Sequence, residues 1–132
     1  SDLKKAKKTA NMARQLYPQS PLPLVMLANI YTCDGDAAKA LGFYNKAKSL
    51  NPDDSAVSAA RLNQYAVELI KAGMVDDARL LLESLIQLYP DEPVLYHSIG
   101  DIYLRIGTKY FKKALKIDPT FKPARDLLKK LD

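Results

Sequence analysis

Large apolar residues recur along the chain at the spacing of one face of an α-helix. In three stretches the second large residue follows the first by three positions and the third follows the second by four, which places all three on one helical stripe. The stripes are Leu24, Leu27 and Tyr31; Leu62, Tyr65 and Leu69; and Tyr96, Ile99 and Tyr103. Leu, Ala and Lys dominate the composition and Gly occurs only 5 times, so composition also favours helix over sheet. The pattern predicts an all-α fold.

Residues that end one helix and begin the next lie between these stripes. A glycine after each stripe marks the left-handed residue that ends a helix, and acidic residues then favour the start of a second helix. These residues are Gly35, Gly73 and Gly107, followed by Asp36, Asp76 and Asp77. Ser20 before Pro21, and more weakly Glu92 before Pro93, can cap a first helix that begins with proline. Each stripe is therefore expected to start a helical hairpin.

The hairpin pattern repeats in register along the chain. Pro18, Pro52, Pro90 and Pro119 lie 34, 38 and 29 residues apart. Small residues keep a fixed distance from these prolines, because the spacings of 12, 7 and 5 occur twice and their last part occurs a third time. The three series are Ala28, Ala40, Ala47 and Pro52; Ala66, Ala78, Leu85 and Pro90, in which Leu85 replaces a small residue; and Ala6, Ala13 and Pro18. Several units in phase are difficult to obtain by chance.

These spacings and residue types resemble the tetratricopeptide repeat, a unit of two antiparallel helices with small residues where the helices cross and a proline after the second helix. Tyr44, Leu82 and Phe111 match the bulky residue of its second helix. The resemblance implies an all-α fold in the form of a right-handed α–α superhelix of stacked antiparallel helical hairpins. One hairpin alone cannot cover its apolar face, so neighbouring hairpins must stack.

We expect residues 1–132 to form a single tetratricopeptide-repeat domain. Its parts are the second helix of a truncated repeat at 1–20, a repeat at 21–54, a repeat with one extra turn at 55–92, a shortened repeat at 93–119 and a capping helix at 120–132. The first helix lacks its partner, so we expect the array to continue before residue 1 in the parent protein.

Two repeats depart from the common length. The interval from Pro52 to Leu62 is 4 positions longer than the matching interval from Pro18 to Leu24, which is about one helical turn. We therefore expect the helix beginning near Asp54 to be one turn longer at its start, with Asp54 or Ser55 as its cap.

The repeat at 93–119 lacks five residues just after Gly107. The preferred interpretation is that a flexible turn is missing from the sequence between Gly107 and Thr108. A hairpin that is shortened in the protein itself is the second interpretation, and a single helix running through Gly107 is the third.

In this family the first helices line a concave groove that binds other proteins. The face next to the packing stripes presents apolar and amide side chains, which suit an extended or helical peptide. The candidate partner-binding residues are Val25, Asn29, Asn63, Gln64, Val67, Lys71, Val94, His97, Ser98, Asp101 and Arg105. The alternative is that these residues are only a tolerated surface. Val25, Val94 and Ser98 stand where chaperone-tail binders need basic residues, so that specificity is disfavoured.

The sequence offers little for catalysis. It has one histidine, His97, and one cysteine, Cys33, and it lacks the HExxH, CxxC, GxSxG and phosphate-loop patterns. We therefore expect no enzyme, no metal site and no cofactor. Base stacking is one interpretation of the 8 tyrosines. However, Tyr31, Tyr65, Tyr96 and Tyr103 fall on the packing stripes and are expected in the core.

The net charge of +5 comes from lysines near both ends of the chain, which we interpret as solvated helix faces rather than a nucleic-acid surface. No run of apolar residues resembles a membrane span or a signal peptide, so a soluble protein is expected, with a cytoplasmic location as the default.

The leading hypothesis is a non-catalytic scaffold for a protein or peptide partner. The alternatives are a structural spacer or self-association module using residues 1–17, and a helical-repeat RNA-binding protein.

Overall fold

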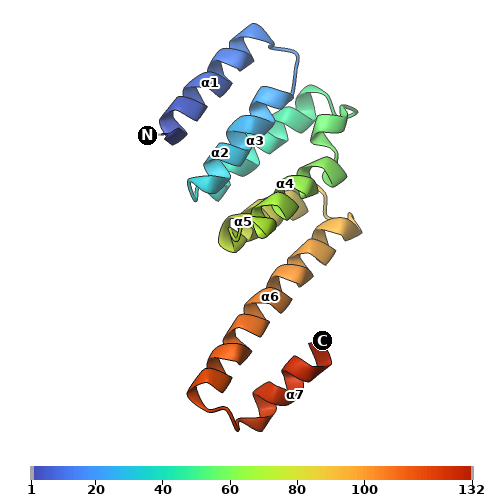
Figure 1. Ribbon diagram of the computed structural model, residues 1–132. Coiled ribbons are helices and arrows are strands. Elements are labelled where there is room, and N and C mark those ends of the chain that lie inside the picture. The colour runs from blue at the N-terminus through green and yellow to red at the C-terminus, as the bar shows by residue number, and fades with distance from the viewer. Residues whose placement is uncertain (1, 132) are drawn as a thin grey trace. The chain divides into compact units, whose positions relative to one another are not determined.

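The computed structural model describes residues 2–131 and divides the chain into two compact units, residues 1–98 and residues 99–132. The described residues form seven α-helices and one short 3-10 helix, and they contain no strand (Figure 1). The expected all-α fold built from helical hairpins is confirmed.

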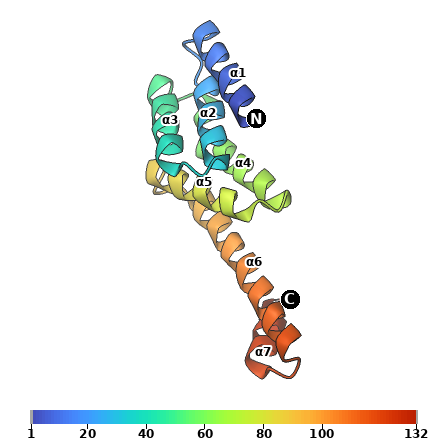
Figure 2. The same cartoon turned by 90° about the vertical axis from the view of Figure 1, so that its left-hand side faces the viewer.

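The first unit begins with three neighbouring helices. α1 (Asp2–Leu16) lies antiparallel to α2 (Leu22–Cys33), and α3 (Ala37–Leu50) returns along α2 to complete a hairpin (Figure 1 and Figure 2). Ser20 accepts a hydrogen bond from the backbone N–H of Leu22 at 3.3 Å, but the cap position of α2 is Pro21, which has no side-chain capping bond. The expected arrangement, with Ser20 as the cap and Pro21 as the first helical residue, is therefore wrong by one residue.

Small residues allow the helices of this hairpin to approach closely. Ala28, Ala40 and Ala47 are fully buried, and the ring of Tyr44 fills the space beside them with only 1% of its surface exposed. Asp36 caps α3 by accepting a hydrogen bond from the backbone N–H of Lys39 at 3.1 Å. The spacing of small and bulky residues in the sequence therefore predicted the packing of this hairpin.

The expected one-turn extension of the next helix is wrong. The surplus residues form a separate 3-10 helix, η1 (Ser55–Val57), which Asp54 caps through the backbone N–H of Ala56 at 2.9 Å. Ser58 then adopts an extended conformation and caps α4 (Ala59–Lys71) through the backbone N–H of Arg61 at 3.2 Å. The hydroxyl of Tyr89 donates a hydrogen bond to the carbonyl oxygen of the buried Val57. This carbonyl therefore has a hydrogen-bond partner without being part of an α-helix.

The second hairpin pairs α4 with α5 (Val75–Leu88), which also packs against α2 and α3. Ala66, Ala78, Leu82 and Leu85 are fully buried, as their register with the first hairpin predicted. The two hairpins are also joined at their ends by Lys48, which donates a hydrogen bond to the carbonyl of Leu88 at 3.0 Å. The hairpins therefore stack within the first unit.

Glycine ends the first helix of both hairpins. Gly35 and Gly73 have φ angles of 79° and 80°, the left-handed conformation that favours glycine over all other residues. Both positions were predicted from the sequence.

The expected hairpin at 93–119 is not formed. α6 is one continuous helix, Pro93–Ile117, and Gly107 lies inside it instead of ending it. With five residues fewer than the other repeats, the segment has no turn sequence after Gly107, and a single glycine is tolerated inside a helix at a cost of about 1 kcal/mol. The third interpretation of this segment, a helix running through Gly107, therefore describes the structure.

In the second unit, α7 (Lys122–Leu131) folds back along the part of α6 that follows residue 98 (Figure 1). Ala124 is the buried residue of α7, with 3% exposure, while Lys129 and Lys130 face the solvent. This is the helix that the sequence predicted at the end of the chain.

Two tyrosines expected in the core are exposed. Tyr96, in the first unit, is 48% exposed and donates a hydrogen bond to the carbonyl of Pro90, and Tyr103, in the second unit, is 53% exposed. The expected second helix of the third hairpin is not formed as a separate element. The packing stripe that contains Tyr96 and Tyr103 therefore lacks the helix that was expected to cover it.

Candidate binding cleft

A cleft of about 220 Å³ opens in the first unit where α2, α4 and α5 come together. Seven residues line it: Asn29, Thr32 and Cys33 from α2, Tyr65, Glu68 and Leu69 from α4, and Leu81 from α5. Within each helix these residues follow one another by one, three or four positions, which keeps them on neighbouring parts of one face. We call this the α2/α4 cleft.

The polar groups from α2 are held by hydrogen bonds inside the first hairpin. Tyr44 donates its hydroxyl to the side-chain oxygen of Asn29, and Thr32 donates its hydroxyl to the carbonyl of Ala28 at 3.0 Å. Burial raises the pKa of Tyr44, so this hydroxyl stays protonated and remains a donor. The amide group of Asn29 is therefore oriented with its oxygen inward, and its nitrogen is the atom available to a ligand.

The polar groups from α4 are arranged around one carboxylate. Gln64 donates a hydrogen bond to Glu68 at 2.9 Å, and Lys71 lies 4.0 Å from the same carboxylate. A ligand in the cleft thus meets an amide donor on the α2 side and an acceptor on the α4 side. This combination suits the backbone N–H and C=O groups of a peptide.

The cleft contains no activated nucleophile. Cys33 is exposed, but partial desolvation of its thiol in the cleft, together with the nearby charge of Asp77, raises its pKa, which keeps the group in its thiol form at neutral pH. Among residues 2–131, no group of three or more histidines, cysteines or carboxylates is arranged to hold a metal ion. In the described part of the chain, no helix is both long and apolar enough to span a membrane.

Residues 56–92 match the family model of the tetratricopeptide repeat. This segment is a tetratricopeptide repeat. The matched segment contains α4 and α5, which supply Tyr65, Glu68 and Leu81 to the cleft. The family recognised from the sequence is thereby confirmed, and the tetratricopeptide repeat forms one wall of the cleft.

Two known proteins are similar to a larger part of the chain. Protein arginine N-methyltransferase 9 of Mus musculus is 29% identical over 102 residues, in an alignment that covers 70% of this chain and 12% of that protein. Protein arginine N-methyltransferase 9 of Homo sapiens is 31% identical over 70 residues, in an alignment that covers 49% of this chain and 8% of that protein. The chain therefore spans only a small share of the length of either relative, and the first alignment extends beyond the single tetratricopeptide repeat.

The structure places three of the eleven predicted site residues at or next to the α2/α4 cleft. Asn29 lines it, and Gln64 and Lys71 contact the lining residue Glu68. Val67, beside them on α4, is half-buried and is not among the lining residues.

Three other predicted residues are buried and do not present a surface to a partner. Val25 is fully buried, Asn63 is 7% exposed and Ser98 is 6% exposed. The prediction for Val25 is wrong because the residue is buried in the first unit, where α1, α3, α5 and η1 all pack against α2. The side-chain oxygen of Asn63 has no hydrogen-bond partner among the described residues.

The remaining predicted residues lie on α6 and are exposed or half-buried. Val94 and His97 are exposed at the start of this helix, within the first unit. Asp101 and Arg105 lie in the second unit, where they form an ion pair with each other at 3.1 Å. None of these four lines the α2/α4 cleft.

The prediction missed the aromatic and acidic side of the cleft. Tyr65 and Leu69 were assigned to the packing stripe, and Glu68 was not considered, although it lies four positions after Gln64. Helical spacing could have identified these residues. Residues three and four positions apart share one face of a helix, so Glu68 lies beside Gln64, and the packing stripe with Tyr65 and Leu69 borders the groove.

Proposed function

We propose that this chain is a non-catalytic protein-interaction module that binds a peptide segment of a partner in the α2/α4 cleft. The observation that carries the proposal is the position of the cleft, which lies between the first helices of two stacked hairpins. Tyr65, Leu69 and Leu81 offer apolar surface for side chains, and Asn29 and Glu68 offer a donor and an acceptor for peptide groups.

The proposal does not extend the enzymatic activity named in the two relatives to this chain. The first alignment covers 12% of the mouse protein, and the second covers 8% of the human protein. We infer that the chain acts as an interaction segment of a longer protein. Its stacked hairpins and its tetratricopeptide repeat support this role.

The test is to fill the cleft and measure peptide binding. Peptides selected from a displayed random library against the complete chain serve as probes, and their affinities are measured by fluorescence anisotropy. Cys33→Trp places a large side chain in the cleft and is expected to weaken binding at least about tenfold, because the ligand loses its space. Gln87→Trp adds the same side chain to an exposed site on α5 and serves as the matched control.

A second variant tests the polar contacts. Asn29→Ala combined with Gln64→Ala removes the amide donor and the group that orients Glu68. The double variant is expected to weaken the same peptides without changing the fold seen by circular dichroism. If Cys33→Trp and the control bind all selected peptides with the affinity of the unchanged chain, the α2/α4 cleft is not the binding site.

A second candidate function is self-association through α1. Met12 and Leu16 are 54% and 71% exposed on this helix, which gives it apolar surface beyond the contacts it makes with α2. Sedimentation of the complete chain tests this function. A monomer at all concentrations would exclude it, and dimerisation that Met12→Lys with Leu16→Lys abolishes would support it.

A further inference from the structure

A second surface of the first unit, formed by α1, α2 and α3, carries cations around two stacked aromatic rings. The rings of Tyr31 and Phe43 are stacked, with centroids 5.4 Å apart and planes 8° from parallel. The ammonium groups of Lys7 and Lys39 lie over the Tyr31 ring, 4.6 Å and 5.3 Å from its centroid. Such contacts hold a cation beside a ring face.

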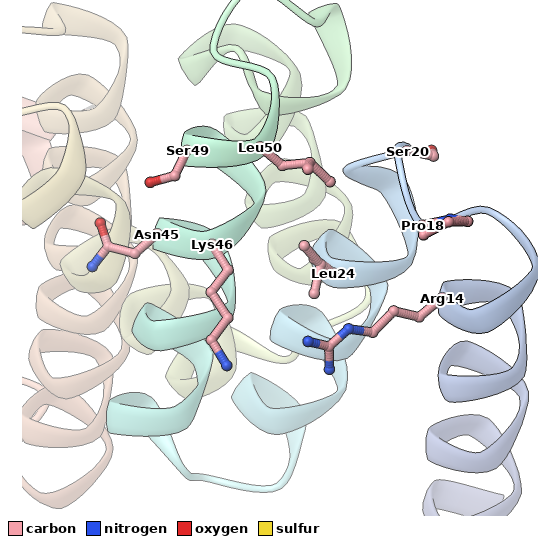
Figure 3. A pocket seen from close by; sticks show the side chains of 8 residues that line it. All are labelled: Arg14, Pro18, Ser20, Leu24, Asn45, Lys46, Ser49 and Leu50. Carbon is pink, nitrogen blue, oxygen red and sulfur yellow. The ribbon is translucent and has the colours of Figure 1, made fainter.

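Two further cations lie over the other ring. The guanidinium group of Arg14 lies 6.0 Å from the centroid of Phe43, and the ammonium group of Lys46 lies 5.3 Å from it. Both side chains also line an open cleft of about 500 Å³, which we call the basic cleft (Figure 3). The other lining residues are Pro18, Ser20, Leu24, Asn45, Ser49 and Leu50.

Only two of the four cations on this surface are paired with a carboxylate among the described residues. Lys7 is paired with Asp34 at 3.0 Å, and Lys39 lies 3.9 Å from Asp36. In contrast, Arg14 and Lys46 form no ion pair within residues 2–131, and no carboxylate is among the residues that line the basic cleft. Two like charges beside one ring repel each other, and an anion bound between them would relieve this repulsion.

We propose that the basic cleft binds an acidic segment of a partner protein, with carboxylates of that segment paired to Arg14 and Lys46. Figure 3 shows the Arg14 side chain reaching from α1 and the Lys46 side chain from α3, with α2 between them, so one extended segment meets both. Asn45 and Ser49 line the same cleft and supply hydrogen-bonding groups for the peptide backbone. The Arg14 guanidinium allows bidentate pairing with a carboxylate.

The same observations disfavour a single-stranded nucleic acid at this site. Base stacking needs a free aromatic face, whereas Tyr31 and Phe43 stack on each other and cations lie over both rings. None of the residues of the basic cleft lines the α2/α4 cleft, so this inference does not depend on the function proposed above.

The experiment measures binding of a synthetic glutamate-rich peptide to the complete chain, with the same peptide carrying glutamine in place of each glutamate as the probe control. Arg14→Gln combined with Lys46→Gln is expected to weaken binding of the glutamate peptide about tenfold or more, because both charge-assisted contacts are lost. Lys8→Gln combined with Arg61→Gln removes the same charge from exposed positions outside the cleft and is expected to bind almost as the unchanged chain does.

Thermal unfolding of both double variants checks that neither has lost its fold. If Arg14→Gln with Lys46→Gln unfolds, the variant Arg14→Lys with Lys46→Arg replaces it. This variant keeps both charges but moves the bidentate group, and it is expected to alter the affinity while the salt dependence stays the same.

Three results would overturn the inference. Equal weakening by the two double variants would show that only the overall charge matters. Equal binding of the glutamine peptide would exclude carboxylate pairing. Tighter binding of a single-stranded oligonucleotide than of the glutamate peptide, lost in the Arg14 and Lys46 double variant, would assign the cleft to nucleic acid instead.

Discussion

The hydroxyl of Tyr44 is enclosed in the first hairpin and donates to Asn29, which lines the α2/α4 cleft. One side chain therefore contributes both to the core and to the orientation of a binding group. Replacing Tyr44 by Phe would leave the Asn29 oxygen without this donor, at a cost of about 1 kcal/mol at neutral pH.

The buried hydroxyl also predicts how stability depends on pH. Burial disfavours the phenolate, so the pKa of Tyr44 in the folded chain is higher than the unfolded value of about 10. Above about pH 10 the unfolded chain releases this proton first, so the free energy of unfolding falls as the pH rises. Tyr44→Phe is expected to reduce this fall, measured by urea unfolding on both sides of that pH.

The matched control for this prediction is Tyr110→Phe, because Tyr110 is 60% exposed. It is expected to leave the alkaline loss of stability unchanged. If Tyr44→Phe and the unchanged chain lose the same free energy between neutral and alkaline pH, the Tyr44 hydroxyl is not enclosed as described.

Two glycines of the first hairpin should respond in opposite ways to the same substitution. Gly35 has a φ of 79°, so Gly35→Ala forces a side chain into the left-handed region and is expected to destabilise the fold by about 1 kcal/mol. Gly42 lies inside α3 with nothing within 4 Å of an added Cβ, so Gly42→Ala is expected to stabilise by about 0.5 to 1 kcal/mol. Urea unfolding of both variants measures the two effects, and a shift of the same sign would contradict the assigned backbone conformations.

At the level of single residues, the sequence was most informative where backbone geometry alone decides the outcome. Gly35 and Gly73 were predicted to end helices, and Asp36 was predicted to favour a helix start, because turns and helix starts depend on local chemistry. Whether Val25 is buried or exposed depends instead on which elements pack against α2. Those elements include η1 and α5, which lie far from Val25 in the sequence. Helical spacing alone could not distinguish a groove position from a buried one there.

At the level of elements, the two irregular repeats were located correctly. The expected extra turn before Leu62 was wrong, and for the segment at 93–119 the preferred interpretation was wrong whereas the third interpretation describes the structure. The surplus before Leu62 became the 3-10 helix η1, because Ser58 caps α4 and leaves the backbone extended just before it. The deficit after Gly107 removed the turn and produced the continuous helix α6. Counting residues between matching positions shows where a repeat is longer or shorter than the others. Local caps and hydrogen bonds then decide whether the helix, a turn or a separate element changes in length.

The continuity of α6 predicts the effect of a substitution at Gly107. In a helix interior, alanine is favoured over glycine by about 0.5 to 1 kcal/mol, and an added Cβ at Gly107 meets the ring of Phe111 at an ordinary 3.6 Å. Gly107→Ala is therefore expected to slow amide hydrogen exchange at residues 106–112. A turn with Gly107 in the left-handed conformation would give the opposite result, because alanine would be strained and exchange would become faster.

At the level of the whole molecule, the repeat pattern predicted the helical hairpins but not the division of the chain. The in-phase alanines Ala28 and Ala66 explain the stacking in residues 1–98. Gly100 directly follows Ile99 of the third stripe, as Ala28 follows Leu27 in the first, yet it is exposed, and the second unit begins one residue before it. The repeat register therefore describes the first unit well and fails where the third hairpin is absent.

The division into two units predicts that a disruption of α7 remains local. Ala124 is 3% exposed, so Ala124→Asp places a charge in a buried position and is expected to detach α7. Hydrogen exchange should then become faster in residues 99–131, whereas the amides of α3 and α5 in the first unit should keep their protection. Lys129→Asp introduces the same residue on the exposed side of α7 and should leave exchange in both units almost unchanged. Faster exchange throughout the chain after Ala124→Asp would show that the two units unfold together and would contradict the division.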